Sequence, residues 1–266
     1  MDALIVHVEG IGLFAPGIAD WPSLQRVLDD DGFALPERAA KPSPAMLPPT
    51  ERRRAPEPVL IASEAAGQAC RMAGRDPATL ACVFVSTHGD LAITDAMCAT
   101  LAADPRELSP TRFHNSVHNA PAGYWTVAAQ CHAAATAISA AHASFAAGLF
   151  EAALEVAADG APVLLAAYDI AAQGPLGEVA PSTLPFAAAF VLSGERPPAP
   201  LASLRLTRRN SDAADRAIPA PLAPLAAGNP MAAQALPLLV ALARRQAAEL
   251  SMAAGAGTSL RVEVSA

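Results

Sequence analysis

Two histidines four residues apart are the first side chains in this sequence that could do chemistry together. His114 and His118 lie in the polar stretch Ser109–Asn119, and a spacing of four places two imidazoles on one face of a helix, as in HExxH metal sites. The stretch carries no glutamate in that pattern, and its polar residues predict a turn. We therefore expect these histidines to organise a loop through hydrogen bonds, and we expect no metal site.

A serine, a histidine and an aspartate also occur close together, in Ser86-Thr87-His88-Gly89-Asp90. This stretch ends a buried strand and opens a helix, which is where α/β sheets bind ligands. A catalytic triad, however, is assembled from separate segments and not from neighbours in sequence. The stretch is therefore interpreted mainly as loop structure, with catalysis as the lesser alternative.

The four cysteines, Cys70, Cys82, Cys98 and Cys131, show no CxxC spacing, which argues against a zinc ribbon or a thioredoxin motif. Cysteines inside apolar segments are typical of buried thiols in a reducing compartment. Cys131 is the best candidate nucleophile, because it lies between a predicted helix and a predicted strand. A reactive thiol needs a base or a helix N-terminus, and the side chain of His132 points elsewhere if this segment is extended.

Composition and charge narrow the classes of protein further. The chain has 266 residues, 53% hydrophobic and 16% charged, with a net charge of −7. The length fits one large α/β domain or two small ones, and we expect a single domain over residues 1–266. The apolar content excludes disorder for most of the chain. The only lysine, Lys41, lies in a proline-rich surface loop at 34–58, so neither a nucleic-acid-binding stripe nor a buried Schiff-base lysine is expected.

The two apolar stretches that could suggest export or membrane insertion do not fit either. Asp2 stands where a signal peptide carries basic residues, and the apolar run stops at His7, so we expect a cytoplasmic protein. Phe113–Phe150 contains no charged residue, but it is rich in alanine and holds several polar residues, unlike a membrane span of ~20 strongly apolar residues. We interpret it as a segment buried by the core and by a partner.

Apolar periodicity, caps and breakers predict the elements that must position these side chains. Strand–helix–strand repetition with continuous apolar strands predicts an α/β fold containing a covered parallel sheet. The predicted strands are 3–13, 80–86, 136–140, 162–168, 186–192, 201–208 and 258–264, with 186–192 and 201–208 expected to be antiparallel; the predicted helices are 21–28, 57–73, 90–102, 120–130, 143–157 and 231–250; the predicted loops are 34–58, 109–119 and 211–230.

Two stretches carry a resemblance to a known family. SPTRFHNSVHNAPAGYW at 109–125 and ASFAAGLFEA at 143–152 resemble the β-ketoacyl-synthase-like chain-length-factor family of the aryl-polyene type, within the thiolase superfamily. The resemblance is specific over 109–152, extends from residue 1 to about 193 and is weak beyond. It implies a thiolase-like α/β fold with one complete βαβαβαββ half and a reduced second half, where the family has two halves with stacked sheets.

The resemblance also implies what this chain does not carry. Active ketosynthases have a nucleophilic cysteine at the start of the helix that follows the dimer strand, and the matching position here is His142. They also use two histidines and a lysine from the second half, whereas this sequence has no histidine after His142 and no lysine after Lys41. The resemblance therefore implies a catalytically silent subunit.

By the same resemblance, this subunit would act as a chain length factor. It would form a heterodimer with an active β-ketoacyl-ACP synthase of polyene or fatty-acid-like biosynthesis, complete its acyl pocket and limit chain length. The acyl carrier protein would bring the substrate on its phosphopantetheine chain, so no cofactor is expected. The alternatives are an independent thiolase-fold acyl transferase or hydrolase that uses Cys131, and a homodimeric scaffold without an acyl ligand.

Three groups of residues become candidates. The motif loop contains His114, Asn115, Ser116, His118 and Asn119; the dimer strand contains Thr136, Ala137, Ile138, Ser139 and Ala140; the wall of the acyl pocket contains Tyr124, Trp125 and Phe145. Tyr124 and Trp125 point about 100° apart on a helix, so at most one lines the pocket fully, and all three could instead be ordinary core aromatics.

Phe113–Phe150 is expected to be the partner surface, and the chain alone is expected to be poorly soluble or to self-associate, with a homodimer possible.

Overall fold

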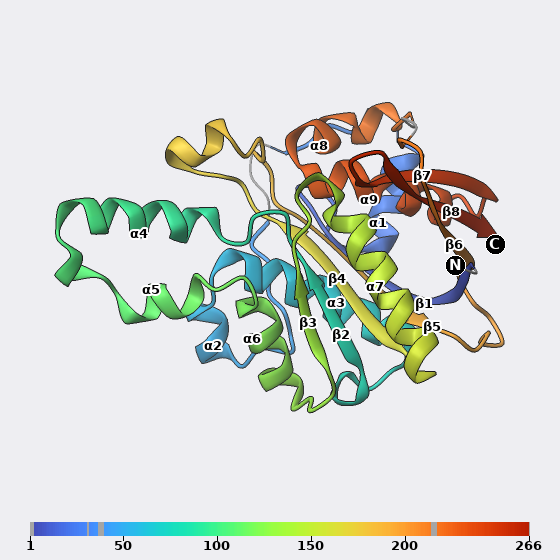
Figure 1. Ribbon diagram of the computed structural model, residues 1–266, viewed down its shortest axis with the longest axis horizontal. Coiled ribbons are helices and arrows are strands. Elements are labelled where there is room, and N and C mark those ends of the chain that lie inside the picture. Colours follow the sequence, from blue (N-terminus) through green and yellow to red (C-terminus); the bar gives the residue numbers. More distant parts are fainter. Residues whose placement is uncertain (1–2, 31, 37–39, 214–216, 266) are drawn as a thin grey trace.

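A mixed eight-stranded sheet forms the frame of the part of the chain that a computed structural model describes, residues 3–30, 32–36, 40–213 and 217–265 (Figure 1). The strands are β1 (Leu4–Phe14), β2 (Ala81–Val85), β3 (Ala135–Ile138), β4 (Val163–Asp169), β5 (Phe186–Ser193), β6 (Ala202–Arg209), β7 (Ala248–Gly255) and β8 (Thr258–Ser265). The helices are α1 (Trp21–Leu28), α2 (Pro49–Arg54), α3 (Glu57–Ala73), α4 (Leu91–Ala103), α5 (Pro110–Asn115), α6 (Ala120–Ala129), α7 (Ser144–Asp159), α8 (Ala223–Gly228) and α9 (Pro230–Ala243).

The strand order is β3-β2-β4-β5-β1-β6-β8-β7. β2 pairs in parallel with both β3 and β4, while β5 pairs antiparallel with β4 and β1. The predicted α/β class with a parallel core is therefore confirmed. The strands expected to form an antiparallel pair, β5 and β6, do not pair with each other, because β1 lies between them and is antiparallel to both.

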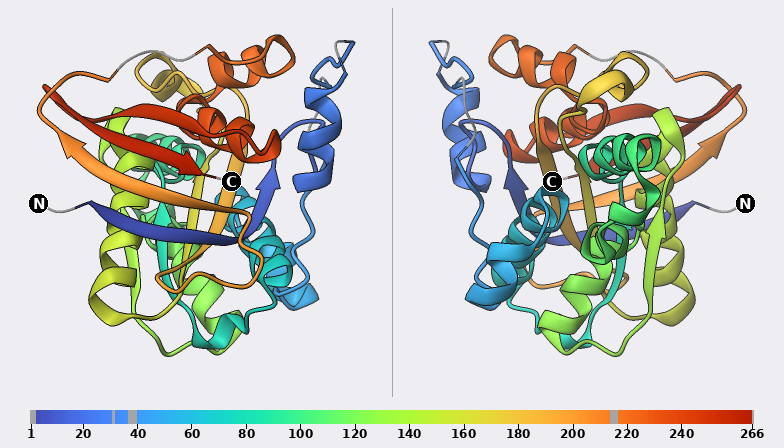
Figure 2. Two further views of the ribbon diagram at one scale, coloured as in Figure 1. Left: turned by 90° about the vertical axis from the view of Figure 1, so that its right-hand side faces the viewer. Right: turned by 90° about the vertical axis from the view of Figure 1, so that its left-hand side faces the viewer.

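The strands of the reduced second half continue the same sheet instead of forming a second one. β6, β8 and β7 follow β1 in antiparallel order, and the sheet coils so that β7 also packs against α7 and against the 3₁₀ turn Ala141–Ala143 (Figure 2). The resemblance implied two halves with stacked sheets. In this chain the strands of the second half, β6, β8 and β7, instead form one end of a single coiled sheet.

Glycines allow two helices to approach the sheet closely. A Cβ atom on Gly12 of β1 would lie 1.8 Å from the Ala65 carbonyl oxygen of α3, and one on Gly148 of α7 would lie 2.1 Å from Cγ2 of Val85 in β2. α3 therefore packs directly on one face of the sheet and α7 on the other. The close contact between Gly148 and Val85 therefore positions α7, and the turn before it, on the sheet.

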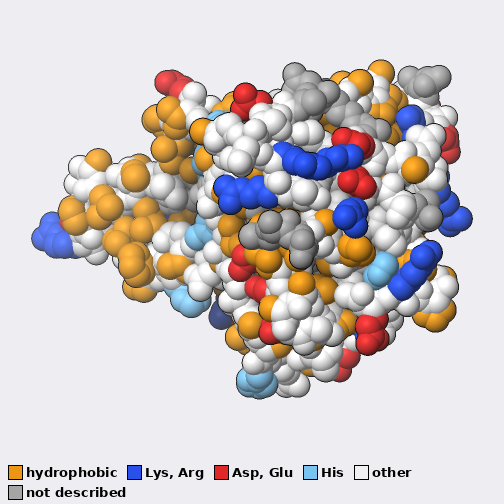
Figure 3. Space-filling model, turned by 45° about the vertical axis from the view of Figure 1, so that its right-hand side comes forward, with side chains coloured by type: hydrophobic (Ala, Val, Ile, Leu, Met, Phe, Trp, Pro, Cys, Tyr) orange, Lys and Arg blue, Asp and Glu red, His pale blue; other side chains and the backbone are white. Residues whose placement is uncertain are grey.

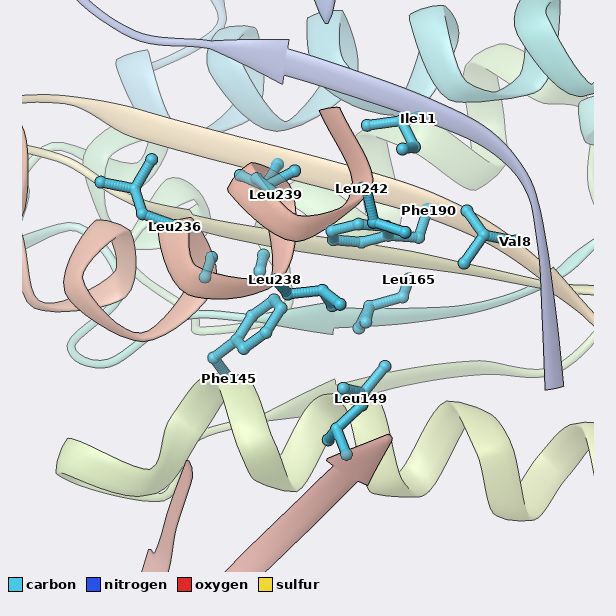
Figure 4. Packing of buried hydrophobic residues seen from close by; sticks show 14 of the residues in the cluster. Val8, Ile11, Phe145, Leu149, Leu165, Phe190, Leu236, Leu238, Leu239 and Leu242 are labelled. Carbon is cyan, nitrogen blue, oxygen red and sulfur yellow. The ribbon is translucent and has the colours of Figure 1, made fainter. Parts of the chain in front are cut away.

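The core has two main apolar clusters, separated by the sheet. Phe145 and Leu149 of α7 point toward residues of α9 and β4, including Leu238 and Leu165 (Figure 4), and the Phe145 ring lies 6.1 Å from that of Phe190. The other cluster packs α3 and α6 against the opposite face. Burying such side chains stabilises the fold by about 1.5–3 kcal/mol each.

Several predicted loops contain helices. The stretch 109–119 was expected to be a turn, but Pro110–Asn115 is helical, because Ser109 caps it through a hydrogen bond from Arg112 N and Pro110 occupies its first turn. α2 lies inside 34–58, and α8 lies inside 211–230. Residues 37–39 and 214–216 of these loops lie outside the described residues.

The helix expected over 231–250 is too long. α9 ends at Ala243, Arg245 takes a left-handed φ of 49°, and β7 begins at Ala248. Alanine and leucine fit both a helix and a buried strand, so the composition concealed the change. The deciding pattern is the period of two over Glu249–Met252, in which Leu250 and Met252 are buried.

α4 and α5 project from the body as an arm (Figure 1). Although α4 is mostly apolar, none of its residues is buried, and Leu101 of α4 and Phe113 of α5 are exposed. Side chains of hydrophobic type dominate this arm in the space-filling view (Figure 3). No helix in the described residues is long and apolar enough to span a membrane.

Candidate functional site

The candidate site lies where three parallel strands end together. β3, β2 and β4 are adjacent and parallel, so their carboxyl ends share one edge of the sheet, the usual location of ligand sites in α/β proteins. The turn that carries His142 follows β3, the Ser86–Asp90 stretch follows β2, and Asp169 is the last residue of β4.

The turn after β3 is strained and places His142 at the start of α7. β3 ends at Ile138, so Ser139 and Ala140 of the predicted dimer strand lie outside it. Ala141 has a φ of 47°, a conformation that costs a non-glycine residue free energy and that clusters at functional sites. Ser144 holds the turn, because its hydroxyl accepts from Ala140 N at 3.0 Å and donates to the Ala141 carbonyl at 2.7 Å. The His142 side chain is exposed.

A buried carboxylate organises the Ser86–Asp90 stretch. The Ser86 hydroxyl donates to Asp169 Oδ1 at 2.7 Å, and Thr87 N donates to the same oxygen at 2.8 Å. Burial raises the pKa of the Asp169 carboxyl, and these hydrogen bonds partly oppose the rise. Because the serine donates to an aspartate on another strand and His88 is exposed, the stretch serves as loop structure.

The same stretch is tied to the turn that carries His142. Ser139 Oγ donates to the Thr87 carbonyl at 2.8 Å, and Asn229 at the start of α9 donates to the Asp169 carbonyl at 3.3 Å. Asp169 thus lies at the centre of contacts among four segments. Sequence reasoning gave it no role; the available signal was an acid placed directly after a continuous apolar strand.

The motif loop separates into two parts. His118 Nε2 lies 3.1 Å from the Ser86 carbonyl, which confirms that this histidine organises a loop, whereas His114 is exposed on α5. Buried Asn115 accepts a hydrogen bond from the Tyr124 hydroxyl at 3.1 Å, and Ser116 Oγ donates to the Phe113 carbonyl. Asn119 precedes α6 without a side-chain cap contact. Within the described ranges, no three metal-binding side chains gather.

The cysteines lie away from this edge of the sheet. Cys131 follows the C-terminal end of α6 and precedes β3, so β3 separates it from the turn that carries His142. Its buried thiol donates to the Leu80 carbonyl at 3.2 Å, while His132 is exposed. Burial raises the pKa of the Cys70 and Cys82 thiols to about 12. Cys98, on the arm, is exposed.

The structure does not bring the three candidate wall aromatics together. Trp125 is fully buried against Phe84, with ring centroids 6.5 Å apart, and Phe145 lies on the opposite face of the sheet. Tyr124 is half-buried and lines an apolar cavity of about 560 Å³ between α2 and α6. Only Tyr124 therefore has the placement of a pocket residue.

The sequence matches one known family. Residues 21–253 match the family model described as beta-ketoacyl synthase, N-terminal domain. The chain belongs to that family. No curated protein sequence matches this ketoacyl-synthase family member.

Solved structures with the same thiolase-like fold cover nearly the whole chain. A chain from the ketosynthase ApeO in complex with its chain length factor ApeC, from Xenorhabdus doucetiae, has a TM-score of 0.75 and 22% identity over 98% of this chain and 99% of its own length. A chain from the AntDE:AntF complex, a type II polyketide synthase ketosynthase with its acyl carrier protein, gives 0.78 and 13% over 100% of both chains. The ishigamide ketosynthase/chain length factor gives 0.72 and 14%, over 98% and 99%.

Proposed function

We propose that this ketoacyl-synthase family member is a non-catalytic chain length factor, which pairs with an active ketosynthase and shapes its acyl pocket. The observation that carries the proposal is His142. It stands after the strained residue Ala141 at the start of α7, where a thiol would gain nucleophilicity from the helix N-terminus. An imidazole there cannot carry an acyl thioester.

The remaining chemistry of the chain supports the same reading. A condensing enzyme must polarise a thioester carbonyl and promote decarboxylation, but the sequence has no histidine after His142 and no lysine after Lys41. Cys131 is the nucleophile of the rival enzyme reading, yet its thiol is buried and donates to a carbonyl. In this proposal the active subunit supplies the cysteine and both histidines.

The surface around β3 supports a partner. β3 lies at an edge of the sheet, and Val127 of α6, the helix that packs against β3, is exposed. Leu101 and Phe113 on the arm and Val117 between α5 and α6 are exposed as well. Contiguous exposed apolar side chains mark interaction surfaces. The proposed partner is a β-ketoacyl-ACP synthase of polyene or fatty-acid-like biosynthesis in the cytoplasm, and an acyl carrier protein presents the growing chain on its phosphopantetheine arm.

Co-expression with a ketosynthase encoded nearby tests the proposal directly. A stable 1:1 complex is expected to co-purify and to extend acyl chains, and His142→Ala is expected to change its rate by only a few-fold. Loss of ~10³-fold, the size of effect typical of a removed catalytic group, would contradict a silent subunit. A chain that never co-purifies with a ketosynthase would contradict the pairing.

Covalent labelling separates the proposal from the rival enzyme. After incubation of the complex with an acyl thioester, intact-protein mass spectrometry is expected to find the acyl group on the ketosynthase and not on this chain. An acyl adduct at Cys131 would instead support an independent acyl transferase or hydrolase.

A further inference from the structure

The edge strand β3 lacks the proline and the charged residues that commonly protect edge strands from pairing. It is the first strand in the sheet order, so the outer side of its backbone has no strand partner among the described residues. Its sequence, Ala135-Thr136-Ala137-Ile138, contains no proline and no charge, the devices by which edges are usually blocked. An exposed edge of this kind pairs with a strand of another chain.

Acidic side chains on α7 lie beside this edge. The Thr136 hydroxyl donates to Glu155 Oε1 at 3.2 Å, which shows that the Glu155 side chain reaches β3. Glu151 and Asp159 are four residues before and after it, on the same face of the helix. We call these three residues the acidic row. Residues 113–150, which precede the acidic row in the sequence, contain no lysine or arginine that could neutralise its charge.

The electrostatics of Glu155 are unfavourable as the chain stands. Its Oε2 atom is shielded from solvent and has no hydrogen-bond partner among the residues that the structure describes. Burial raises the pKa of the Glu155 carboxyl, and the negative charges of Glu151 and Asp159 raise it further, against the hydrogen bond from Thr136. A donor or a positive charge from outside the chain would relieve both the missing hydrogen bond and the repulsion.

Pairing of two identical copies through β3 would increase that repulsion. A closed dimer of identical chains has a two-fold axis, and an axis through the short strand β3 sets α7 beside its own copy. The Glu155 side chain reaches β3, and the Debye length is about 8 Å at physiological salt. Salt would therefore screen the repulsion between the two acidic rows in part, without abolishing it where their carboxylates come within about that distance.

We propose that the acidic row prevents tight self-pairing through β3 and selects, as partner, a thiolase-fold chain of different sequence whose helix beside its own edge strand carries lysine or arginine. This inference rests on the proposed function and specifies the partner's chemistry. Exposed apolar side chains near β3 attract any partner without distinguishing one from another. Val127 of α6, on the face of the sheet opposite α7, is 79% exposed. The row limits how far that attraction can drive the self-association expected from the sequence.

Neutralising the row tests the first half of the inference on this chain alone. Sedimentation equilibrium would compare the wild type with Glu151→Gln/Glu155→Gln/Asp159→Asn and with a control of equal charge change on exposed positions outside α7 and β3, Asp29→Asn/Asp30→Asn/Asp212→Asn. The row variant is expected to self-associate about tenfold or more tightly than the wild type. The control is expected to stay within about twofold. Equal dissociation constants for the row variant and the control would overturn the inference, as would a wild type that already dimerises as tightly as the row variant.

A charge swap tests selection. Wild type mixed with Glu151→Lys/Glu155→Lys/Asp159→Lys is expected to form a 1:1 heterodimer about tenfold or more tightly than either chain pairs with itself. Circular dichroism checks folding, and Glu155→Gln and Glu155→Lys replace the triple variants if these unfold. Absence of preferential mixing would overturn the inference. This result is independent of the ketosynthase, so failed co-purification counts only against the proposed function.

Discussion

The Ser86 hydroxyl donates a 2.7 Å hydrogen bond to Oδ1 of Asp169, and this buried contact joins the ends of β2 and β4. Thr87 N donates to the same oxygen. One carboxylate thus fixes the loop that, through Ser139, supports the turn before α7. The alignment of three strand ends at the site depends on this single acceptor.

Replacing Asp169 is therefore expected to have effects that depend on the substituent. Asp169→Ala leaves the Ser86 hydroxyl and Thr87 N buried without an acceptor, at about 1–3 kcal/mol of unfolding free energy for each group. Asp169→Asn keeps an acceptor oxygen for both donors, so its loss is expected to be smaller. Urea denaturation of both variants measures the difference, and equal losses would contradict this role for Asp169.

The same pair of variants gives a pH dependence. Burial raises the pKa of Asp169 above its usual value, so the native state holds this proton more tightly than the unfolded state. Its stabilising contribution is complete below pH ~4 and is lost as the pH rises through the native pKa. The unfolding free energy of Asp169→Asn relative to the wild type is expected to rise over that window. A difference that stays constant with pH would show that the pKa of Asp169 is not raised in the native state.

The close approach of α7 to β2 predicts that Gly148→Ala is destabilising. The new methyl would lie 2.1 Å from Val85 Cγ2, and overpacking of this kind costs about 1–3 kcal/mol. Gly123→Ala in α6 is the matched control, because its methyl meets nothing within 4 Å and is expected to stabilise the helix by about 0.4–1 kcal/mol. Thermal unfolding of both variants measures the contrast; equal shifts would show that α7 can move away from β2.

Tyr124 is the one aromatic expected to affect product length without unfolding the chain. Tyr124→Ala in the complex is expected to give longer products, because it enlarges the lined cavity, whereas Tyr124→Phe keeps the ring and serves as control. Trp125→Ala and Phe145→Ala remove fully buried rings and are expected to cost about 3–5 kcal/mol. Unchanged product length from all three alanine variants, with the complex intact, would remove these residues from the pocket.

The thiols are expected to differ sharply in reactivity. Cys98 is exposed, and the other three cysteines are buried, so a native titration with a disulfide reagent is expected to modify one thiol quickly. Cys98→Ser is the control that removes this phase. Fast modification of Cys131 in that variant would reopen the possibility that it acts as a nucleophile.

Elements with strong local signals could be predicted from the sequence. Asp20 caps α1, Gly74 ends α3 in a left-handed conformation, and the apolar run of β4 is buried throughout. The errors arose where one signal fits two structures: Ser109-Pro110 begins a helix as readily as a turn, and the alanine-rich segment after Ala243 becomes β7.

The site was predictable only in part. The resemblance led to His142, but nothing in an alanine indicates the positive φ that Ala141 adopts. The partner of Ser86 is 83 residues away, and no spacing rule relates residues that only the tertiary fold brings together. That Phe145 and Trp125 lie on opposite faces of the sheet likewise depends on topology, which helical periodicity does not report.

The interior position of β1 has a consequence for how the chain folds during synthesis. His7 pairs with Ser193 and Val6 pairs with Leu204, so both neighbours of β1 are made long after it. An apolar strand at the start of the chain therefore remains unpaired on the ribosome until residues beyond 186 have emerged. Such distant pairings fold slowly and leave hydrophobic surface open to aggregation, so β1 is the strand whose apolar side chains stay exposed longest before their sheet partners are made.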